Sequence, residues 1–352
     1  IGGDEFAVLL DDATTEPAAV AAERILHALS QPFLVDDRDV YTSASIGIAM
    51  ADPGHAEAEQ LLRDADIAMH RAKAAGKGRH EAYRPSMHAD AVRRLELQGD
   101  LQRALERGEL VVYYQPIIDL VSNRPASFEA LVRWRHPVHG IIGPDRFIPI
   151  AEETGLIVAL GRWVLIEACR QARLWQARFG AAITMAVNIS ARQVAGGSLL
   201  ADVGDALRGS GLEPAQLTLE LTESALMADI DLAAATLQAL RATGVRIAID
   251  DFGTGYSSLS YLDRLPVDLI KIDRSFVAAL DDPAREPTLV RIMVDLAHSL
   301  NIPIVAEGIE STQQRDNLQQ LGCPLGQGFL FAPPNEPQTL EAALDDRVPG
   351  PR

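Results

Sequence analysis

From about residue 109 to residue 344, the sequence repeats one unit, in which a short apolar run rich in β-forming residues precedes a stretch with helical spacing. The runs that we expect to form strands cover residues 110–116, 127–132, 183–188, 217–221, 245–250, 269–273, 304–307 and 327–331. Strands that alternate with helices are typical of a parallel sheet, and eight strands are enough to close a barrel. This α/β repeat therefore predicts an (α/β)8 barrel of the TIM type over residues 109–345.

Nearly every expected strand carries a polar residue inside it or at its C-terminal end. These residues are Gln115, Glu129, Asn188, Glu220, Asp250, Lys271, Glu307 and Gln327. In a TIM-type barrel the C-terminal strand ends and their loops form the active site, so we expect these side chains to converge there. Taken alone, an Asp or Glu at a strand end has a simpler explanation as a cap on the next helix. The joint pattern favours a site.

Residues 245–249 are apolar except for Arg246 and lead directly into two adjacent carboxylates, Asp250 and Asp251. Two like charges at the end of a buried strand need a cation to neutralise them. Glu129, Asn188 and Glu220 add further oxygen ligands, and a set without His or Cys suits Mg²⁺ or Mn²⁺ rather than zinc. Because adjacent aspartates can hold two ions about 4 Å apart, we expect a two-metal site.

A two-metal site suits hydrolysis of a phosphodiester, since two ions polarise the phosphoryl oxygens, lower the pKa of a bound water and stabilise the leaving alkoxide. Lys271 would hold the attacking water or neutralise developing charge, and Glu307 would take the proton. Two alternatives stay open at this point. Lys271 could form a structural ion pair within the carboxylates, and Glu307 could cap the following helix.

Composition limits the partners and the location. The formal net charge of −17 argues against general binding of DNA or RNA, because proteins that bind phosphate backbones present basic faces. No apolar run approaches the roughly 18 residues of a membrane span. The two cysteines, Cys169 and Cys323, do not form a C-x-x-C motif. These features favour a cytoplasmic protein without a membrane segment in this chain, and a parent protein anchored in the membrane upstream of Ile1 is compatible with them.

Residues 1–84 contain fewer expected strands than an independent core needs. A short apolar run covers residues 6–10, helical spacing covers 17–29, a strand is expected over 41–50, and a helix over 58–75 ends at Gly76. Because the chain begins without Met and inside an apparent motif, we expect the back half of a domain from a longer protein. Over residues 85–108, Leu97, Leu101 and Leu105 lie four apart and predict a linking amphipathic helix.

Seven runs, in order along the chain, resemble the motifs of the EAL family, which comprises cyclic di-GMP phosphodiesterases. The runs are Glu129-Ala130-Leu131-Val132-Arg133-Trp134, Asn188-Ile189-Ser190, Glu220-Leu221-Thr222-Glu223, Asp250-Asp251-Phe252-Gly253-Thr254-Gly255, Lys271-Ile272-Asp273, Ala306-Glu307-Gly308-Ile309-Glu310 and Gly326-Gln327-Gly328-Phe329. The resemblance implies metal-dependent hydrolysis of one phosphodiester of cyclic di-GMP to linear pGpG, as part of bacterial second-messenger signalling.

The resemblance also implies roles by motif position. The metal ligands for two Mg²⁺ or Mn²⁺ ions would be Glu129, Asn188, Glu220, Asp250 and Asp251. Glu307 would act beside them as ligand or general base, and Lys271 would position water. The residues that contact or orient substrate would be Gln115, Leu131, Arg133, Asp273 and Gln327, with Arg133 at a phosphate. Glu223 would brace the loop 252–259, which in the family couples dimerisation to metal binding, so we expect a homodimer through the barrel.

The first residues resemble the second half of a GGDEF diguanylate cyclase domain. Gly2-Gly3-Asp4-Glu5-Phe6 is the motif itself, and residues 65–73 with Gly76-Lys77 are similar to its later helix. In that family the glycine turn lets the backbone approach the nucleotide, and Asp4 would help hold metal. For the five motif residues alone, an ordinary hairpin turn is the alternative. Because the preceding half is not in this chain, we expect a partial α+β domain that makes no cyclic di-GMP.

A rival hypothesis from a different class is a catalytically silent EAL receptor, which binds cyclic di-GMP and acts through protein contacts. Degenerate receptors of this kind lose metal ligands or the residue at the position of Glu307, and all of these residues are present here. A third hypothesis, that the intact parent protein is mainly a cyclase, concerns residues outside this chain.

Overall fold

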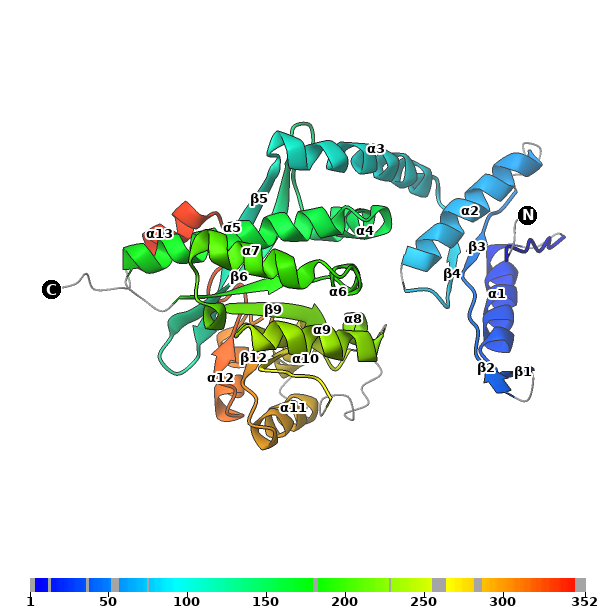
Figure 1. Cartoon of the computed structure of the whole chain (residues 1–352). Helices are drawn as coiled ribbons and strands as arrows, with labels where there is room; N and C mark the ends of the chain where they lie inside the picture. The colour runs from blue at the N-terminus through cyan, green and yellow to red at the C-terminus, as the bar shows by residue number, and fades with distance from the viewer. Residues whose placement is uncertain are drawn as a thin grey trace. The chain divides into compact units, whose positions relative to one another are not determined.

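The structure is a computed structural model of the chain (Figure 1). It describes residues 4–11, 14–35, 38–51, 57–74, 76–179, 183–227, 229–254, 264–281 and 287–345. The chain divides into two compact units, Ile1–Gly99 and Asp100–Arg352. No helix within the described ranges is both long enough and apolar enough to cross a membrane.

Before the long helix that begins at Pro85, the described residues of the first unit form two helices and two small sheets. These elements are α1 (Thr15–Leu29), β1 (Phe33–Val35), β2 (Arg38–Val40), β3 (Ile46–Ile48), α2 (Ala58–Ala74) and β4 (His80–Ala82). β1 and β2 form an antiparallel pair, and β3 and β4 a parallel pair. A Cβ at Gly47 would lie 1.8 Å from the carbonyl oxygen of Ala65, so only glycine allows α2 to approach β3 this closely.

Two segments of the first unit differ from the strands and apolar runs expected from the sequence. The strand expected over residues 41–50 is limited to β3, and the apolar run 6–10 lies outside any helix or strand. Phe6 and Leu9 are 91% and 92% exposed, and none of the described strands pairs with this run. Of the motif that opens the chain, Gly2 and Gly3 lie outside the described residues, as does Ala75 at the end of the second expected helix. The expected helix over 85–108 is α3 (Pro85–Arg107), which ends before Gly108 at a φ of +66°.

Eight strands of the second unit close into a barrel (Figure 1). They are β5 (Leu110–Asp119), β6 (Arg124–His136), β8 (Thr184–Asn188), β9 (Leu217–Thr222), β10 (Arg246–Phe252), β11 (Leu269–Ile272), β12 (Ile304–Ala306) and β13 (Leu325–Gly326). Around the barrel their order is β5-β13-β12-β11-β10-β9-β8-β6, and β5 pairs with β6 to close the ring. A ninth strand, β7 (Gly140–Ile142), extends β6 as a hairpin outside the ring. The TIM-type barrel predicted from the repeat is therefore confirmed.

One strand of the barrel runs against the others. β5 is antiparallel to both of its neighbours, β6 and β13, whereas the remaining neighbours in the ring are parallel. Only residues 120–123 connect β5 to β6, with Asn123 in the left-handed region at a φ of +56°. A loop of this length can close a hairpin but cannot make the crossover that a parallel pair needs. The expectation of an entirely parallel barrel was therefore wrong for this strand.

Helices cover the outside of the barrel (Figure 1). They are α4 (Pro144–Thr154), α5 (Ile157–Phe179), α6 (Ala191–Ala195), α7 (Leu199–Ser210), α8 (Glu223–Met227), α9 (Ile230–Ala242), α10 (Arg274–Ala278), α11 (Thr288–Ser299), α12 (Thr312–Gln320) and α13 (Pro337–Asp345), with short 3-10 turns η1 (Pro214–Gln216) and η3 (Ala279–Asp281). On α5, Trp175 is fully buried and its ring lies 5.0 Å from that of Tyr114 and 4.6 Å from that of Phe128. Such aromatic contacts fix the helix layer on β5 and β6.

The last barrel strand is shorter and earlier than expected. The sequence predicts a strand over 327–331, but β13 ends at Gly326 and the following residues form a turn. In that turn the Leu330 N–H donates to the carbonyl of Ile309 at 3.0 Å, and a Cβ at Gly328 would lie 2.1 Å from the same carbonyl oxygen. The apolar run is therefore held by a loop contact rather than a sheet ladder. Beyond the turn, the backbones of Tyr114 and Asn335 exchange hydrogen bonds at 2.8 and 3.0 Å. This bridge attaches the chain after the turn to the part of β5 that β13 does not reach.

Candidate metal centre

The strands bring the predicted polar residues to one region of the barrel. Their positions are Gln115 in β5, Glu129 in β6, Asn188 at the end of β8, Glu220 in β9, Asp250 in β10, Lys271 in β11, Glu307 directly after β12 and Gln327 directly after β13. Gln115 faces Glu129 across the β5–β6 pair, and Asn188 faces Glu220 across β8–β9. Hydrogen bonds and ion pairs connect all eight side chains.

Lys271 is the centre of this cluster and has no solvent exposure. Its Nζ lies 2.6 Å from Glu307 Oε1 and 2.7 Å from Glu220 Oε2. Glu129 and Asp250 are further carboxylate partners, at 3.5 and 3.4 Å. One buried ammonium therefore faces four carboxylates, and the cluster keeps an excess of negative charge.

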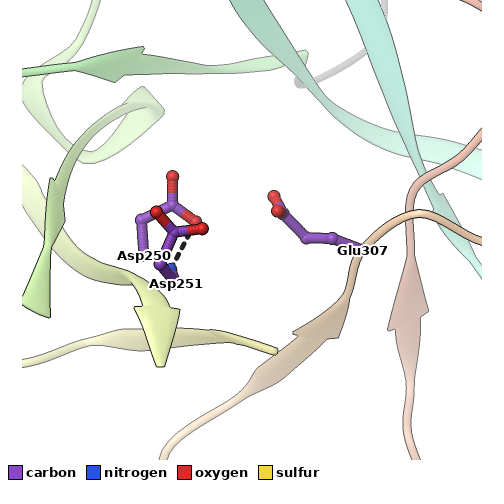
Figure 2. A group of neighbouring side chains, drawn as sticks. All are labelled: Asp250, Asp251 and Glu307. Carbon is purple, nitrogen blue, oxygen red and sulfur yellow. Dashed lines mark hydrogen bonds between the residues drawn. The ribbon is translucent and has the colours of Figure 1, made fainter. Parts of the chain in front are cut away.

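Asp250, Asp251 and Glu307 form a group whose carboxylate oxygens lie within 4.8 Å of one another. Figure 2 shows Glu307 pointing from the end of β12 toward the two aspartates. Adjacent residues of a regular strand point to opposite faces, so two neighbouring aspartates should not share one side. Here the β10–β11 register shifts between Ile249 and Phe252, and Asp251 has a φ of +53°. This bulge turns both carboxylates toward Glu307.

The shared environment moves the pKa values of the acidic groups. Burial, together with the charges of Asp250 and Glu129, raises the pKa of Glu307 to about 8, although Lys271 opposes the shift. Burial and the neighbouring Asp250 and Asp273 raise the pKa of Asp251 to about 6. In the protein without metal, each of these two carboxyls therefore gains or loses a proton near neutral pH.

The pKa values of the two buried glutamates beside Lys271 shift in opposite directions. Burial and the charges of Glu129 and Asp250 raise the pKa of Glu220 well above its ordinary value, against the effect of Lys271. Burial would also raise the pKa of Glu129, but Lys271 and hydrogen bonds from Gln327 and Asn188 hold it below the ordinary value. Lys271 and the two amides thus favour the ionised form of Glu129.

The cluster has the donors that a hard divalent cation requires. Glu220 Oε1 and Gln327 Oε1 are buried and have no hydrogen-bond partner among the described residues. An unpartnered buried oxygen costs free energy unless another group satisfies it, and a bound cation would do so. All candidate ligand atoms are carboxylate or amide oxygens, the set that suits Mg²⁺ or Mn²⁺. The residues therefore fit a metal ion.

An amide chain holds Glu129 from the side of β5. Gln327 Nε2 donates to Glu129 Oε2 at 2.6 Å and to Gln115 Oε1 at 2.8 Å. Gln115 Nε2 in turn donates to the carbonyl of Ala332 at 3.0 Å. On the other side of Glu129, Asn188 Nδ2 donates to Oε1 at 2.6 Å. Both carboxylate oxygens of Glu129 are thus fixed by amides.

Three residues predicted to contact substrate lie around this cluster. Leu131 and Arg133 follow Glu129 on β6 at intervals of two residues, so they share its strand face. Asp273 caps α10, where its Oδ1 accepts from the Ser275 N–H at 3.0 Å, and it also neighbours Asp251. The cap gives Asp273 a structural role, and a contact of Asp273 with substrate stays a prediction.

Glu223 begins α8 and accepts a hydrogen bond from the Gly253 N–H at 3.0 Å through Oε2. Gly253 follows the two aspartates by two residues and has a φ of +93°. The expected contact between Glu223 and the loop after β10 is therefore present at its first residues. Residues 255–259 of that loop lie outside the described residues.

Two residues beside the cluster, Tyr113 and Glu336, lie outside the sequence motifs. Tyr113 precedes Gln115 by two residues on the same face of β5, and its hydroxyl lies 3.3 Å from Glu336 Oε1. The period of two along β5 could have identified Tyr113. No local pattern indicates Glu336, because its contact depends on the loop that returns to β5.

Comparison with known proteins agrees with this geometry. A family model described as EAL domain matches residues 98–334, and a model described as diguanylate cyclase, GGDEF domain matches residues 1–79. A solved structure described as PaMucR phosphodiesterase in complex with c-di-GMP superimposes with a TM-score of 0.67 and 48% identity, and covers 70% of this chain and 99% of that chain.

Two curated bacterial proteins are similar over almost the whole chain. The bifunctional diguanylate cyclase/cyclic di-GMP phosphodiesterase MucR of Pseudomonas aeruginosa is 45% identical over 345 residues, which is 98% of this chain and 50% of MucR. The cyclic di-GMP phosphodiesterase PdeR of Escherichia coli is 41% identical over 333 residues, which is 95% of this chain and 50% of PdeR. The chain thus spans about half the length of these relatives. Through residues 98–334 the chain belongs to the EAL domain family, and its first 79 residues are part of a GGDEF domain.

Proposed function

We propose that this chain hydrolyses cyclic di-GMP to linear pGpG with the help of Mg²⁺ or Mn²⁺. The observation that carries the proposal is the group of Asp250, Asp251 and Glu307, whose oxygens converge beside Lys271 in a member of the EAL domain family. The names of MucR and PdeR, which include cyclic di-GMP phosphodiesterase, support the choice of substrate.

The metal ligands that we propose are Glu129, Asn188, Glu220, Asp250 and Asp251. Two bound cations would supply stabilisation of the phosphoryl oxygens and a water of lowered pKa. Around them, Lys271 holds the carboxylates of Glu220 and Glu307 in place through contacts of 2.7 and 2.6 Å. This fixed arrangement supports a role for the cluster in catalysis, because preorganised charges need no rearrangement during the reaction.

Glu307 is the proposed proton acceptor. In the protein without metal, burial raises the pKa of Glu307 to about 8, so this carboxyl can gain and release a proton near neutral pH. We further propose that Lys271 positions the attacking water, and that Glu223 supports the backbone after Asp251. The proposed substrate contacts are Gln115, Leu131, Arg133, Asp273 and Gln327.

Several features of the wider protein stay predictions. We infer a homodimer through the barrel and a cytoplasmic location. We also infer a division into residues 1–84, a linking helix over 85–108 and a barrel over 109–345. Residues 1–84 are predicted to form no cyclic di-GMP from GTP.

The proposed function is tested by incubating the purified chain with cyclic di-GMP and Mg²⁺ or Mn²⁺ and separating the nucleotides by chromatography. The expected product is linear pGpG. Tight binding of cyclic di-GMP without any pGpG would contradict the enzyme and favour the silent receptor. Incubation with GTP in the same assay tests the prediction for residues 1–84.

A further inference from the structure

Arg133 presents a guanidinium that is only partly exposed. It lies on the same face of β6 as Glu129, and its NH1 donates to the carbonyl of Val132 at 2.8 Å. Burial lowers the pKa of Arg133, and the charges of Glu129 and Asp145 oppose this shift without forming an ion pair with it. Within the part of the chain that the structure describes, no carboxylate lies within ion-pair distance of this guanidinium. Such a cation retains donors for an anion from outside.

The ring of Tyr113 lies beside the Arg133 guanidinium. The Arg133 Cζ lies 5.7 Å from the centroid of this ring. Tyr113 faces Leu131 across the β5–β6 pair, and Leu131 lies between Glu129 and Arg133 along β6. An aromatic face attracts a cation but accepts none of its N–H groups in strong hydrogen bonds. The ring can therefore hold Arg133 without using the donors that would bind a phosphate.

Glu336 fixes the other end of Tyr113. Its Oε1 lies 3.3 Å from the Tyr113 hydroxyl, which donates to it, and 2.8 Å from Arg135 NH2. The residue before it, Asn335, exchanges two backbone hydrogen bonds with Tyr114. The charge of Glu336 is thus opposed by Arg135, and the loop that carries it is attached to β5.

We propose that Tyr113 is a positioning residue for Arg133, and that Glu336 and Arg135 hold its ring so that the guanidinium is directed at a phosphate of the substrate. The inference rests on the proposed function, because that phosphate is one of cyclic di-GMP. A phosphate contact made equally in the ground state and the transition state changes the affinity for substrate and not the chemical step. Loss of the ring should therefore raise KM and Kd and leave kcat similar.

A double-mutant cycle on the affinity for cyclic di-GMP tests this inference. The Kd is measured by calorimetry in EDTA for wild type, Tyr113→Leu, Arg133→Ala and the double variant, because chelation prevents turnover. We expect Tyr113→Leu to raise the Kd about threefold to thirtyfold. In the Arg133→Ala background, Tyr113→Leu should have no further effect, since the ring acts through Arg133. Independent effects that multiply in the double variant would overturn the inference.

Matched variants separate the ring from its hydroxyl and from general changes. Tyr113→Phe keeps the aromatic face and should raise the Kd less than Tyr113→Leu. Tyr83→Leu, the same exchange in the first unit, should leave the Kd at the wild-type value. If Tyr113→Leu does not fold, as judged by its unfolding midpoint, the same cycle is run with Tyr113→Met, which fills similar space without an aromatic face.

Turnover measurements distinguish this inference from the proposed function. A wild-type chain that binds but does not hydrolyse cyclic di-GMP contradicts the proposed enzyme, while the cycle of Kd values still decides the role of Tyr113. Hydrolysis by wild type together with a Tyr113→Leu variant that loses kcat at unchanged KM would overturn the inference alone. A wild-type chain that binds no cyclic di-GMP would overturn both.

Discussion

Lys271 Nζ lies 2.7 Å from Glu220 Oε2, and neither side chain is exposed to solvent. The second oxygen of Glu220 has no hydrogen-bond partner among the described residues, although it is equally buried. One ammonium therefore serves several carboxylates and leaves part of their negative charge unbalanced. Such a cluster is stable only if protons or added cations supply the missing positive charge.

Replacement of Lys271 by Met should destabilise the metal-free protein. Removing one partner of a buried ion pair costs about 3–5 kcal/mol, because the other charge is left uncompensated. The loss should be larger at pH 8 than at pH 5, since protonated carboxyls do not need the ammonium. Urea unfolding in EDTA at both pH values measures the loss in the free energy of unfolding. Lys73→Met, an exposed lysine of α2, is the control, and equal stability of Lys271→Met and wild type would contradict the prediction.

The affinity for Mn²⁺ should rise between pH 6 and pH 8. The raised pKa values of Asp251, about 6, and Glu307, about 8, mean that these carboxyls bind protons which a cation must displace. As pH rises the protons leave, so the Kd for Mn²⁺ should fall by at least about tenfold over this range. Calorimetric titration at each pH measures the change. Asp251→Asn should flatten the dependence, and an affinity that is equal at pH 6 and pH 8 would argue against these ligands.

Glu223→Ala should lower turnover through the backbone after Asp251. The Gly253 N–H would lose its acceptor at 3.0 Å, so the bulge that directs Asp250 and Asp251 would be less fixed. The expected loss in kcat/KM is about tenfold or more, the range found for residues that support metal ligands. Glu223→Gln keeps an oxygen acceptor and should lose less. Steady-state kinetics with Mn²⁺ would contradict the prediction if both variants matched wild type.

Gly308→Ala should destabilise the protein and displace Glu307. Gly308 has a φ of +67°, and an added Cβ would lie 2.4 Å from Arg274 Cβ. Strain of this kind costs about 1–3 kcal/mol. Gly99→Ala is the matched control, because a Cβ there meets no atom within 4 Å and lies inside a helix, where alanine is favoured by roughly 0.5–1 kcal/mol. Chemical unfolding measures both changes, and similar midpoints for the two variants would refute the steric argument.

Much of the barrel could be predicted from the sequence because its strands are short apolar runs that end in polar residues. Glu129, Glu220 and Lys271 all lie inside barrel strands, as the pattern indicated. The reversed direction of β5 was missed, although the four residues 120–123 were too few for a crossover. The position of β13 was missed because Phe329, Leu330 and Phe331 have the composition of a strand but belong to a turn.

The sequence indicates which residues form the candidate site better than it indicates how their side chains are arranged. The pair Asp250-Asp251 indicated a cation, but the strand period of two places neighbouring side chains on opposite faces. Only the bulge and the left-handed backbone of Asp251 explain how both reach Glu307. The contact between Tyr113 and Glu336 joins residues 223 positions apart, and no local pattern encodes such a pair.

Formation of pGpG by the wild-type chain and by Asp250→Asn tests the central claim most directly. The rate is measured after EDTA treatment and again after addition of Mn²⁺, with exposed Asp295→Asn as the control. We expect no product in EDTA, and recovery of the rate with Mn²⁺ in wild type and in the control. The rate of Asp250→Asn should fall by more than about 100-fold, which exceeds the effect of removing a group that only supports a metal ligand. Unfolding midpoints of the variants should stay similar in EDTA. Hydrolysis that persists in EDTA, or full activity of Asp250→Asn, would contradict the account.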